Sequence, residues 1–157
     1  MTSDWNKAGL MLRAVRQSDL PLLEHWLNDH DTRLRMDGLQ PLSQWFGYYD
    51  SSQGRIFAWI GYAQEQPIGM IIVETEEEAG YIAMMVNPAL RNRGFGKRLL
   101  KEAMNHPGLS HLQRWEAGIE ADNQASIACF RALQFTADKA EPDEDGFISY
   151  IYDGSCV

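Results

Sequence analysis

The segment VNPALRNRGFGKRLLKEAM, from Val86 to Met104, places a basic loop with two glycines between an apolar run and a helix-like run. It holds five of the 14 Lys and Arg residues of a chain whose net charge is −8: Arg91, Arg93, Lys97, Arg98 and Lys101. The first N–H groups of a helix have no partner within the helix, and the helix dipole adds partial positive charge there. Glycine lets such a backbone approach an anion closely. The segment therefore predicts a strand, a loop and a helix that bind a small anionic ligand.

Two common phosphate loops are excluded by the residues of this segment. A Walker loop requires glycine at the position of Arg91, and Ser or Thr at the position of Arg98. The dinucleotide-binding fingerprint requires a third glycine at the position of Leu99. The pattern that remains is R-x-x-G-x-G, from Arg91 to Gly96.

Hydrophobic periodicity predicts one α/β (α+β) domain over residues 1–157, with a mixed sheet. The element order is β-α-α-β-β-β-α-β-α-β-β. The predicted strands cover residues 10–15, 55–64, 68–76, 80–88, 112–120, 135–140 and 147–153, and the predicted helices cover 19–29, 41–50, 94–104 and 122–133.

Local signals refine this prediction. Ser18 is expected to cap the first helix, and residues 31–40 to form a loop or an irregular helix. Short connections favour an antiparallel meander through residues 55–88. Its last two strands are nearly continuous in apolar residues, which predicts that both of their faces are buried.

Composition limits location and partners. The net charge of −8 argues against a nucleic-acid partner and is compatible with a cationic substrate, although it can equally serve solubility alone. No apolar run is long enough to span a bilayer and no signal peptide is evident, so we expect a cytoplasmic protein with no membrane partner. We expect a monomer or a homodimer. Cys129 and Cys156 form neither a disulfide framework nor a metal-site pattern, and we expect no metal.

Two segments carry a resemblance to a known family. RNRGFG after VNP, followed by KRLL, resembles the acetyl-CoA pyrophosphate loop of the GNAT superfamily of N-acetyltransferases. IEADNQASIACFRALQF, residues 119–135, resembles the strand and helix of that family, with Asn123 on its Asn. LRAVRQSDLPLLEHWLND is faintly similar to the start of the branch containing aminoglycoside 6'-N-acetyltransferases and ribosomal-protein acetyltransferases. The resemblance implies a GNAT-like, mostly antiparallel central sheet of six to seven strands, flanked by about four helices.

The resemblance also implies acetyl-CoA as cofactor and a primary amine as acceptor, which attacks the thioester directly in a ternary complex. The pyrophosphate would bind mainly backbone N–H groups, with added charge from the basic side chains, at Arg91, Arg93, Gly94, Phe95, Gly96 and Lys97. The pantetheine arm would pair with the preceding strand at Met84, Met85 and Val86. Asn123 and Phe130 would border the same arm from the last helix. A plain N-cap is an equally good explanation of Asn123, and the two roles are compatible.

The chain departs from the family pattern at two places. The position of the usual proton donor, a Tyr, is Phe130, and the usual Gly before the final Phe is Gln134, so the turn there is expected to be made differently. Water, Tyr152 or Tyr150 could protonate the thiolate, or the CoA thiolate can leave without help. Both tyrosines also fit ordinary packing on their strand. The strand before the loop offers no carboxylate in its first residues.

Candidates for the general base are therefore taken from neighbouring strands. Glu120 is the first choice and Glu74 the second, and each can also be an ordinary solvated carboxylate. His25 and His30 are weaker candidates, for which a surface position is the simpler explanation.

The acceptor is expected against the two N-terminal helices and the final hairpin. Aromatic and acidic residues that suit a cationic amine lie there or nearby: Trp26, Asp29, Asp31, Trp45, Tyr48 and Tyr49. The two tryptophans also fit core positions. These features predict a cationic small molecule or a basic peptide N-terminus as acceptor. The alternative is a non-catalytic acyl-CoA-binding sensor or assembly module, favoured by the missing Tyr and the missing strand carboxylate.

Overall fold

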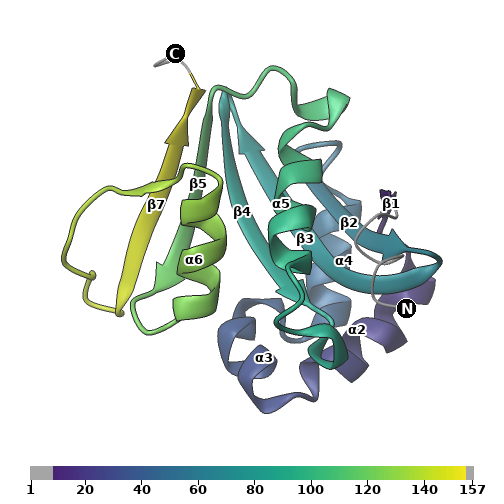
Figure 1. The fold of residues 1–157 in the computed structure, drawn as a ribbon. Coiled ribbons are helices and arrows are strands. Elements are labelled where there is room, and N and C mark those ends of the chain that lie inside the picture. Colours follow the sequence, from purple (N-terminus) through teal and green to yellow (C-terminus); the bar gives the residue numbers. More distant parts are fainter. Residues whose placement is uncertain (1–8, 155–157) are drawn as a thin grey trace.

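The computed structural model describes residues 9–154 and forms one continuous seven-stranded sheet (Figure 1). The strand order is β1-β2-β3-β4-β5-β7-β6. All neighbouring strands are antiparallel except β4 and β5, which are parallel. The strands are β1 (Leu10–Ala14), β2 (Ile56–Ala63), β3 (Gln66–Glu76), β4 (Ala79–Val86), β5 (Arg114–Glu120), β6 (Thr136–Ala137) and β7 (Phe147–Asp153). The predicted mixed, mostly antiparallel fold is confirmed.

Within residues 9–154, five α-helices accompany the sheet, one more than expected. They are α2 (Leu20–Leu27), α3 (His30–Arg35), α4 (Leu42–Asp50), α5 (Phe95–Met104) and α6 (Gln124–Ala132). Short 3-10 turns cover Gln17–Asp19, Asp37–Leu39, Pro88–Leu90 and Pro107–Leu109. No helix in the described part of the chain combines the length and apolar character needed to cross a membrane.

Two sequence predictions about these helices were wrong. Ser18 lies inside the 3-10 turn, and α2 begins one residue after Asp19, which occupies the N-cap position. The stretch expected to be a loop or irregular helix contains the regular helix α3, whose N-cap, Asp29, accepts a hydrogen bond from the Thr32 N–H at 3.1 Å. This cap fixes the start of a helix too polar to be found by hydrophobic periodicity.

The sheet separates two apolar cores. α5 and α6 cover one face, where Leu99, Leu100 and Phe130 are buried. α2 and α4 cover the β2–β3 half of the opposite face, where Leu23, Trp26 and Leu42 are buried. Strand alternation therefore decides which side chains of β4 and β5 meet α6 and which face the opposite side.

Helix α5 sits unusually close to the sheet because two paired glycines face it. Gly61 and Gly69 are cross-strand partners on β2 and β3. A Cβ atom at Gly61 would lie 2.5 Å from the Cδ2 of Leu99, and one at Gly69 would lie 2.7 Å from its Cδ1. The fully buried Leu99 thus packs α5 directly against the backbone of β2 and β3 and fixes the position of the α5 N-terminus.

The prediction that both faces of β3 and β4 are buried holds for most of β3 and is wrong for β4. On β4, Ile82 and Met85 are buried, whereas Tyr81 and Ala83 are exposed, Tyr81 by 41%. Helices α2 and α4 cover β2 and β3 and leave this part of β4 open. An apolar run does not distinguish a strand covered on both faces from one whose second face is left open.

Strands β4 and β5 are joined only at one end. Their pairing covers Ala79–Arg114, Gly80–Trp115 and Tyr81–Glu116, and no later residue of either strand is paired to the other among those described. β4 continues to Val86 and β5 to Glu120, so the two strands form a fork that opens toward the basic loop. We call this opening the fork.

Candidate active site

The basic loop joins the open end of β4 to helix α5. Two of its residues adopt left-handed backbone conformations, Asn92 with φ 63° and Gly94 with φ 79°. Gly94 is the N-cap of α5, and its carbonyl accepts from the Arg98 N–H at 3.3 Å. Phe95 is buried and anchors the first turn in the core. This geometry directs the first N–H groups of α5 out of the helix end, as an anion site requires.

Gly96 faces side chains of β4 and α6 across the first turn of α5. A Cβ atom there would lie 3.5 to 3.6 Å from Val86 Cγ2, Cys129 Sγ and Met84 Cε. These atoms line the α6 side of the fork, so a ligand bound at the loop can continue along β4 without meeting a side chain at position 96. The site thus fits a long ligand with an anionic head, as acetyl-CoA is. Burial raises the pKa of the Cys129 thiol to about 11, so this thiol is neutral at pH 7.

The residues predicted for the pantetheine arm divide between the two faces of the sheet. Met84 and Val86 are half-buried on the α5 and α6 side, whereas Met85 is buried in the opposite core. Antiparallel pairing to β3 occupies one edge of this segment. Its other edge faces the fork, where a ligand backbone can pair in place of β5.

The guanidinium of Arg91 is held by helix α3 and does not point freely toward a ligand. It forms an ion pair with Asp29 and donates to the Thr32 hydroxyl at 2.7 Å. The hydrogen bond from Arg91 and that from the Thr32 N–H lower the pKa of Asp29 to about 2. Arg93 and Lys97 are exposed, so they are the predicted loop cations left to face an anion.

Asn87 is a positioning residue that the sequence interpretation missed. It is buried, caps the turn after β4 by accepting from the Ala89 N–H at 3.0 Å, and donates to the Pro67 carbonyl at 3.1 Å. Its own N–H donates to the Ile68 carbonyl at 2.8 Å. These bonds tie the start of the loop to β3. A buried Asn followed by Pro is the only sequence signal for this role.

Helix α6 borders the fork from the β5 side. Asn123 caps it by accepting from the Ser126 N–H at 3.4 Å. Phe130 is buried, and its ring meets Phe135 edge-to-face at 5.0 Å between centroids. The position that carries Tyr in the family pattern is therefore part of an aromatic core here.

The turn after α6 keeps the geometry that glycine would give. Gln134 adopts φ 74°, while its N–H donates to the Arg131 carbonyl and the Phe135 N–H donates to that of Phe130. This is a Schellman ending with a non-glycine residue in the left-handed position. The prediction that the turn is made differently was wrong, because Gln134 accepts the strained conformation itself.

The two tyrosines considered as proton donors lie on the α6 side of β7. The Tyr152 ring lies 5.7 Å from that of Phe135, and Tyr150 is buried beneath Arg131. Their use in catalysis stays a prediction.

Both carboxylates considered as general bases are held by arginines. Glu120 contacts Arg35 at 3.0 Å, and Arg35 also binds Asp122 at 2.8 Å, which lowers the pKa of Asp122. Glu74 forms an ion pair with Arg55 and accepts from the Tyr48 hydroxyl at 3.1 Å. Sequence spacing contained no signal for either pair, because each joins residues from distant segments.

The residues predicted for the acceptor side are dispersed. Trp26 is buried in the second core, Trp45 stacks on Tyr49 at 5.5 Å, and Asp29 is occupied by Arg91. Asp31, His25 and His30 are on the surface. Tyr48 is linked to the open face of β4 through its hydrogen bond to Glu74, the β3 partner of Tyr81.

A hollow of about 890 Å³ lies beside the open face of β4. It is lined by Gln53, Gly54, Arg55, Glu74, Thr75, Glu76, Glu77 and Tyr81. Three carboxylates and one guanidinium surround the exposed ring of Tyr81, which gives the hollow a negative charge. We call it the acidic hollow.

Comparison with known proteins agrees with this geometry. The model of the Acetyltransferase (GNAT) family matches residues 16–135. The uncharacterized N-acetyltransferase YfmK of Bacillus subtilis (strain 168) is 39% identical over 139 residues, which cover 88% of this chain and 93% of that protein.

Solved structures share the fold at low sequence identity. An acetyltransferase from Salmonella typhimurium that modifies the N-terminal serine of ribosomal protein L7/L12 is 19% identical, with a TM-score of 0.76 over 92% of this chain and 95% of that one. A chimera of spermidine N-acetyltransferase SpeG from Vibrio cholerae and hSSAT is 14% identical, with a TM-score of 0.77 and coverage of 95% and 98%. AAC(6')-Ib in complex with ribostamycin and coenzyme A is 16% identical, with a TM-score of 0.75 and coverage of 94% of both chains.

Proposed function

The chain belongs to the acetyltransferase (GNAT) family, and from this premise we propose that it acetylates a primary amine on a cationic small molecule or a basic peptide N-terminus. As a member of the family it is an acetyl-CoA-dependent N-acetyltransferase, which favours the enzymatic prediction over the binding module. The amine attacks the thioester directly while both substrates are bound. A cytoplasmic location and a monomeric or homodimeric state remain predictions of the sequence.

The basic loop and β4 bind different parts of acetyl-CoA, which supplies the activated acetyl group. The N–H groups in the first turn of α5 hold the pyrophosphate, with Arg93 and Lys97 adding charge at the surface. Gly96 leaves the path along β4 free, and the main chain of Met84–Val86 pairs with the pantetheine arm at the fork. The N–H groups of the same edge can polarise the thioester carbonyl.

The observation that most supports a cationic acceptor is the open face of β4. Tyr81 presents an exposed ring beside the fork, and Glu74, Glu76 and Glu77 surround it in the acidic hollow. An ammonium group gains from an aromatic face and from nearby carboxylates. Ala83, two residues beyond Tyr81, is exposed on the same face, so this face continues along β4 toward the proposed cofactor path. Three structural neighbours are described with acceptors or ligands of this kind, a polyamine, an aminoglycoside and a protein N-terminus.

The test is release of CoA thiol from acetyl-CoA across amines of graded charge, at several ionic strengths. We expect polyamines, aminoglycosides or basic peptides to give the highest kcat/KM, and this value to fall as salt screens the hollow. A neutral or acidic acceptor used more efficiently than any cationic one, with no salt dependence, contradicts the proposal.

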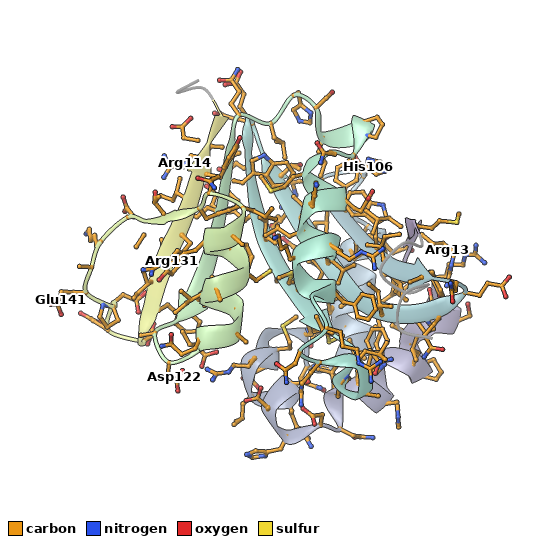
Figure 2. All side chains as sticks on the ribbon, in the orientation of Figure 1. Arg13, His106, Arg114, Asp122, Arg131 and Glu141 are labelled. Carbon is orange, nitrogen blue, oxygen red and sulfur yellow. The ribbon has the colours of Figure 1, made fainter. Side chains whose placement is uncertain are left out.

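Two double variants test whether the preference for a cationic acceptor comes from the acidic hollow or from the overall charge. Glu76→Gln with Glu77→Gln removes two charges from the acidic hollow and should lower kcat/KM for a cationic acceptor roughly threefold. Glu141→Gln with Glu144→Gln removes the same charge from the exposed loop at the far edge of the molecule (Figure 2). Equal losses in the two variants would show that only the overall charge matters.

A further inference from the structure

We infer that Glu116 of β5 accepts the proton of the attacking amine, directly or through one water. The inference rests on the proposed function, and it assigns a role that sequence analysis gave to Glu120 or Glu74. It follows from three features of the fork: where Glu116 lies, what surrounds it, and how the other carboxylates are held.

Glu116 stands where the two central strands separate. Tyr81–Glu116 is the last pair between β4 and β5, and both side chains occupy the same row of the sheet. Trp115 and Ala117 are buried on the α6 side, so alternation places Glu116 on the opposite face, with the exposed Tyr81. Glu116 therefore lies at the closed end of the fork, beside Tyr81, which lines the acidic hollow.

The next row along the strands is the open passage between cofactor and acceptor. On this row Ala83 of β4 and Gly118 of β5 face the fork, and both are exposed. A Cβ atom at Gly118 would meet nothing closer than Phe147 at 3.9 Å. Two residues along a strand rise about 7 Å, so a carboxylate on Glu116 is within reach of this passage with at most one water between.

The other two candidates are held elsewhere. Glu120 lies four residues further along β5, about 13 Å away, and contacts Arg35. Glu74 is bound by both Arg55 and the Tyr48 hydroxyl. Glu116 has a single recorded ion pair within residues 9–154, a contact of 3.9 Å with Arg114 on its own strand. Its side chain is 23% exposed, so a proton that it receives can pass to solvent.

The charged groups around Glu116 are compatible with its role as proton acceptor. The charged or titratable groups facing Glu116 are Tyr81 on β4, Arg114 on β5, Asp153 as the β7 partner of Arg114, and Glu74 beyond Tyr81. Its own β7 partner is the apolar Ile151. Glu116 contacts Arg114, whereas Arg35 binds Asp122, and Figure 2 shows Arg114 and Asp122 near opposite ends of β5.

The proton balance of the reaction is complete with this assignment. The acceptor ammonium gives one proton to Glu116, which leaves the neutral amine, and Glu116 passes this proton to solvent. As the nitrogen bonds to the acetyl carbon, the C–S bond breaks with its electron pair on sulfur. The nitrogen loses its second proton to water, and the thiolate is protonated through water, because Phe130 cannot donate. The products are the amide and CoA thiol, with one proton released.

The experiment compares Glu116→Gln with Glu120→Gln, using Glu141→Gln as a control for loss of one surface charge. We expect Glu116→Gln to lower kcat at pH 7 by about a hundredfold, with an unchanged melting shift on adding acetyl-CoA. Activity should recover as pH rises, and the loss should shrink for a weakly basic amine that is already neutral at pH 7. A residue needed only for folding would show neither recovery.

The outcomes separate this inference from the proposed function. Full activity in Glu116→Gln together with loss in Glu120→Gln overturns the assignment and leaves the proposed function intact. An equal loss for weakly and strongly basic amines, at every pH, assigns Glu116 a structural role and also overturns it. Wild-type protein that binds acetyl-CoA but acetylates no amine refutes the proposed function, and the assignment with it.

Discussion

Replacing Gly69 with Ala tests how the sheet positions the cofactor site. The added Cβ would lie 2.5 Å from the Met85 carbonyl oxygen, 2.7 Å from Leu99 Cδ1 and 3.1 Å from Val86 Cα. Two of these atoms belong to the backbone of β4, which cannot rotate away as a side chain can. β4 must therefore move from β3, and it is the strand whose free edge is proposed to pair with the pantetheine arm.

The size of the effect follows from the nature of the clash. Overpacking a core costs about 1–3 kcal/mol, and a backbone clash belongs at the upper end. For a chain of this length, about 3 kcal/mol corresponds to a fall in Tm of roughly 6–12 °C. Because Met85 and Val86 are displaced, acetyl-CoA should also stabilise the variant less than wild type. Thermal and urea unfolding with and without acetyl-CoA measure both effects.

Two further glycine variants control the experiment. A Cβ at Gly61 would clash at 2.5 Å with Leu99 Cδ2 alone, its other neighbours being side chains at 3.5 Å or beyond. Combination with Leu99→Ala should therefore remove most of the cost of Gly61→Ala, but only part of that of Gly69→Ala. Gly118→Ala, whose nearest atom is at 3.9 Å, should melt close to wild type. Equal melting of Gly69→Ala and Gly118→Ala would refute the reasoning.

Three other predictions concern the loop, the turn after α6 and the α3 cap. Gly96→Val should lose the stabilisation of about 2.7 kcal/mol that acetyl-CoA gives at one hundred times its Kd. Gly96→Ala, whose Cβ makes ordinary contacts only, should still fold. Stabilisation by acetyl-CoA that persists in Gly96→Val contradicts the proposed pyrophosphate site. Gln134→Gly should raise stability by up to about 1 kcal/mol in urea unfolding, because φ 74° costs Gln but not Gly. The Asp29 pKa of about 2 lies below its usual 3.8, so its ion pair stabilises the fold above about pH 4 and is lost as pH falls through 2. The stability difference between wild type and Asp29→Asn, about 1 kcal/mol after solvent screening, should therefore shrink below pH 4 and vanish only below about pH 2.

Sequence alone predicted the parts of the molecule that depend on local pattern. The glycines and cations of residues 91–97 indicated a strand, loop and helix, and the helix begins at Phe95 with Gly94 as its cap. Alternation in residues 147–153 placed β7 correctly. These features require only near neighbours in the chain, so periodicity and cap preferences were sufficient.

The features that were missed depend on contacts between distant segments. Helix α3 is too short and polar for periodicity, and it is stabilised by Arg91, 62 residues after its cap Asp29. The exposure of Tyr81 follows from where α2 and α4 end over the sheet, which an apolar run cannot report. The ion pair between Arg35 and Glu120 likewise appears only when the fold is assembled. Sequence therefore predicted the strand, loop and helix of the basic segment better than the partners of its carboxylates.

Helix α3 gives these missed contacts a common function, because it joins both sides of the fork. At its start, Asp29 and Thr32 bind Arg91, which follows β4. At its end, Arg35 binds Glu120 and Asp122, which close β5. β4 and β5 have no pairing of their own at this end, so the six-residue helix replaces it with side-chain bonds and leaves the strand edges free for a ligand. Arg91 and Glu120 thus hold the two strand ends at a fixed separation through α3, while the chemistry is proposed to take place further in, beside Ala83, Gly118 and Glu116.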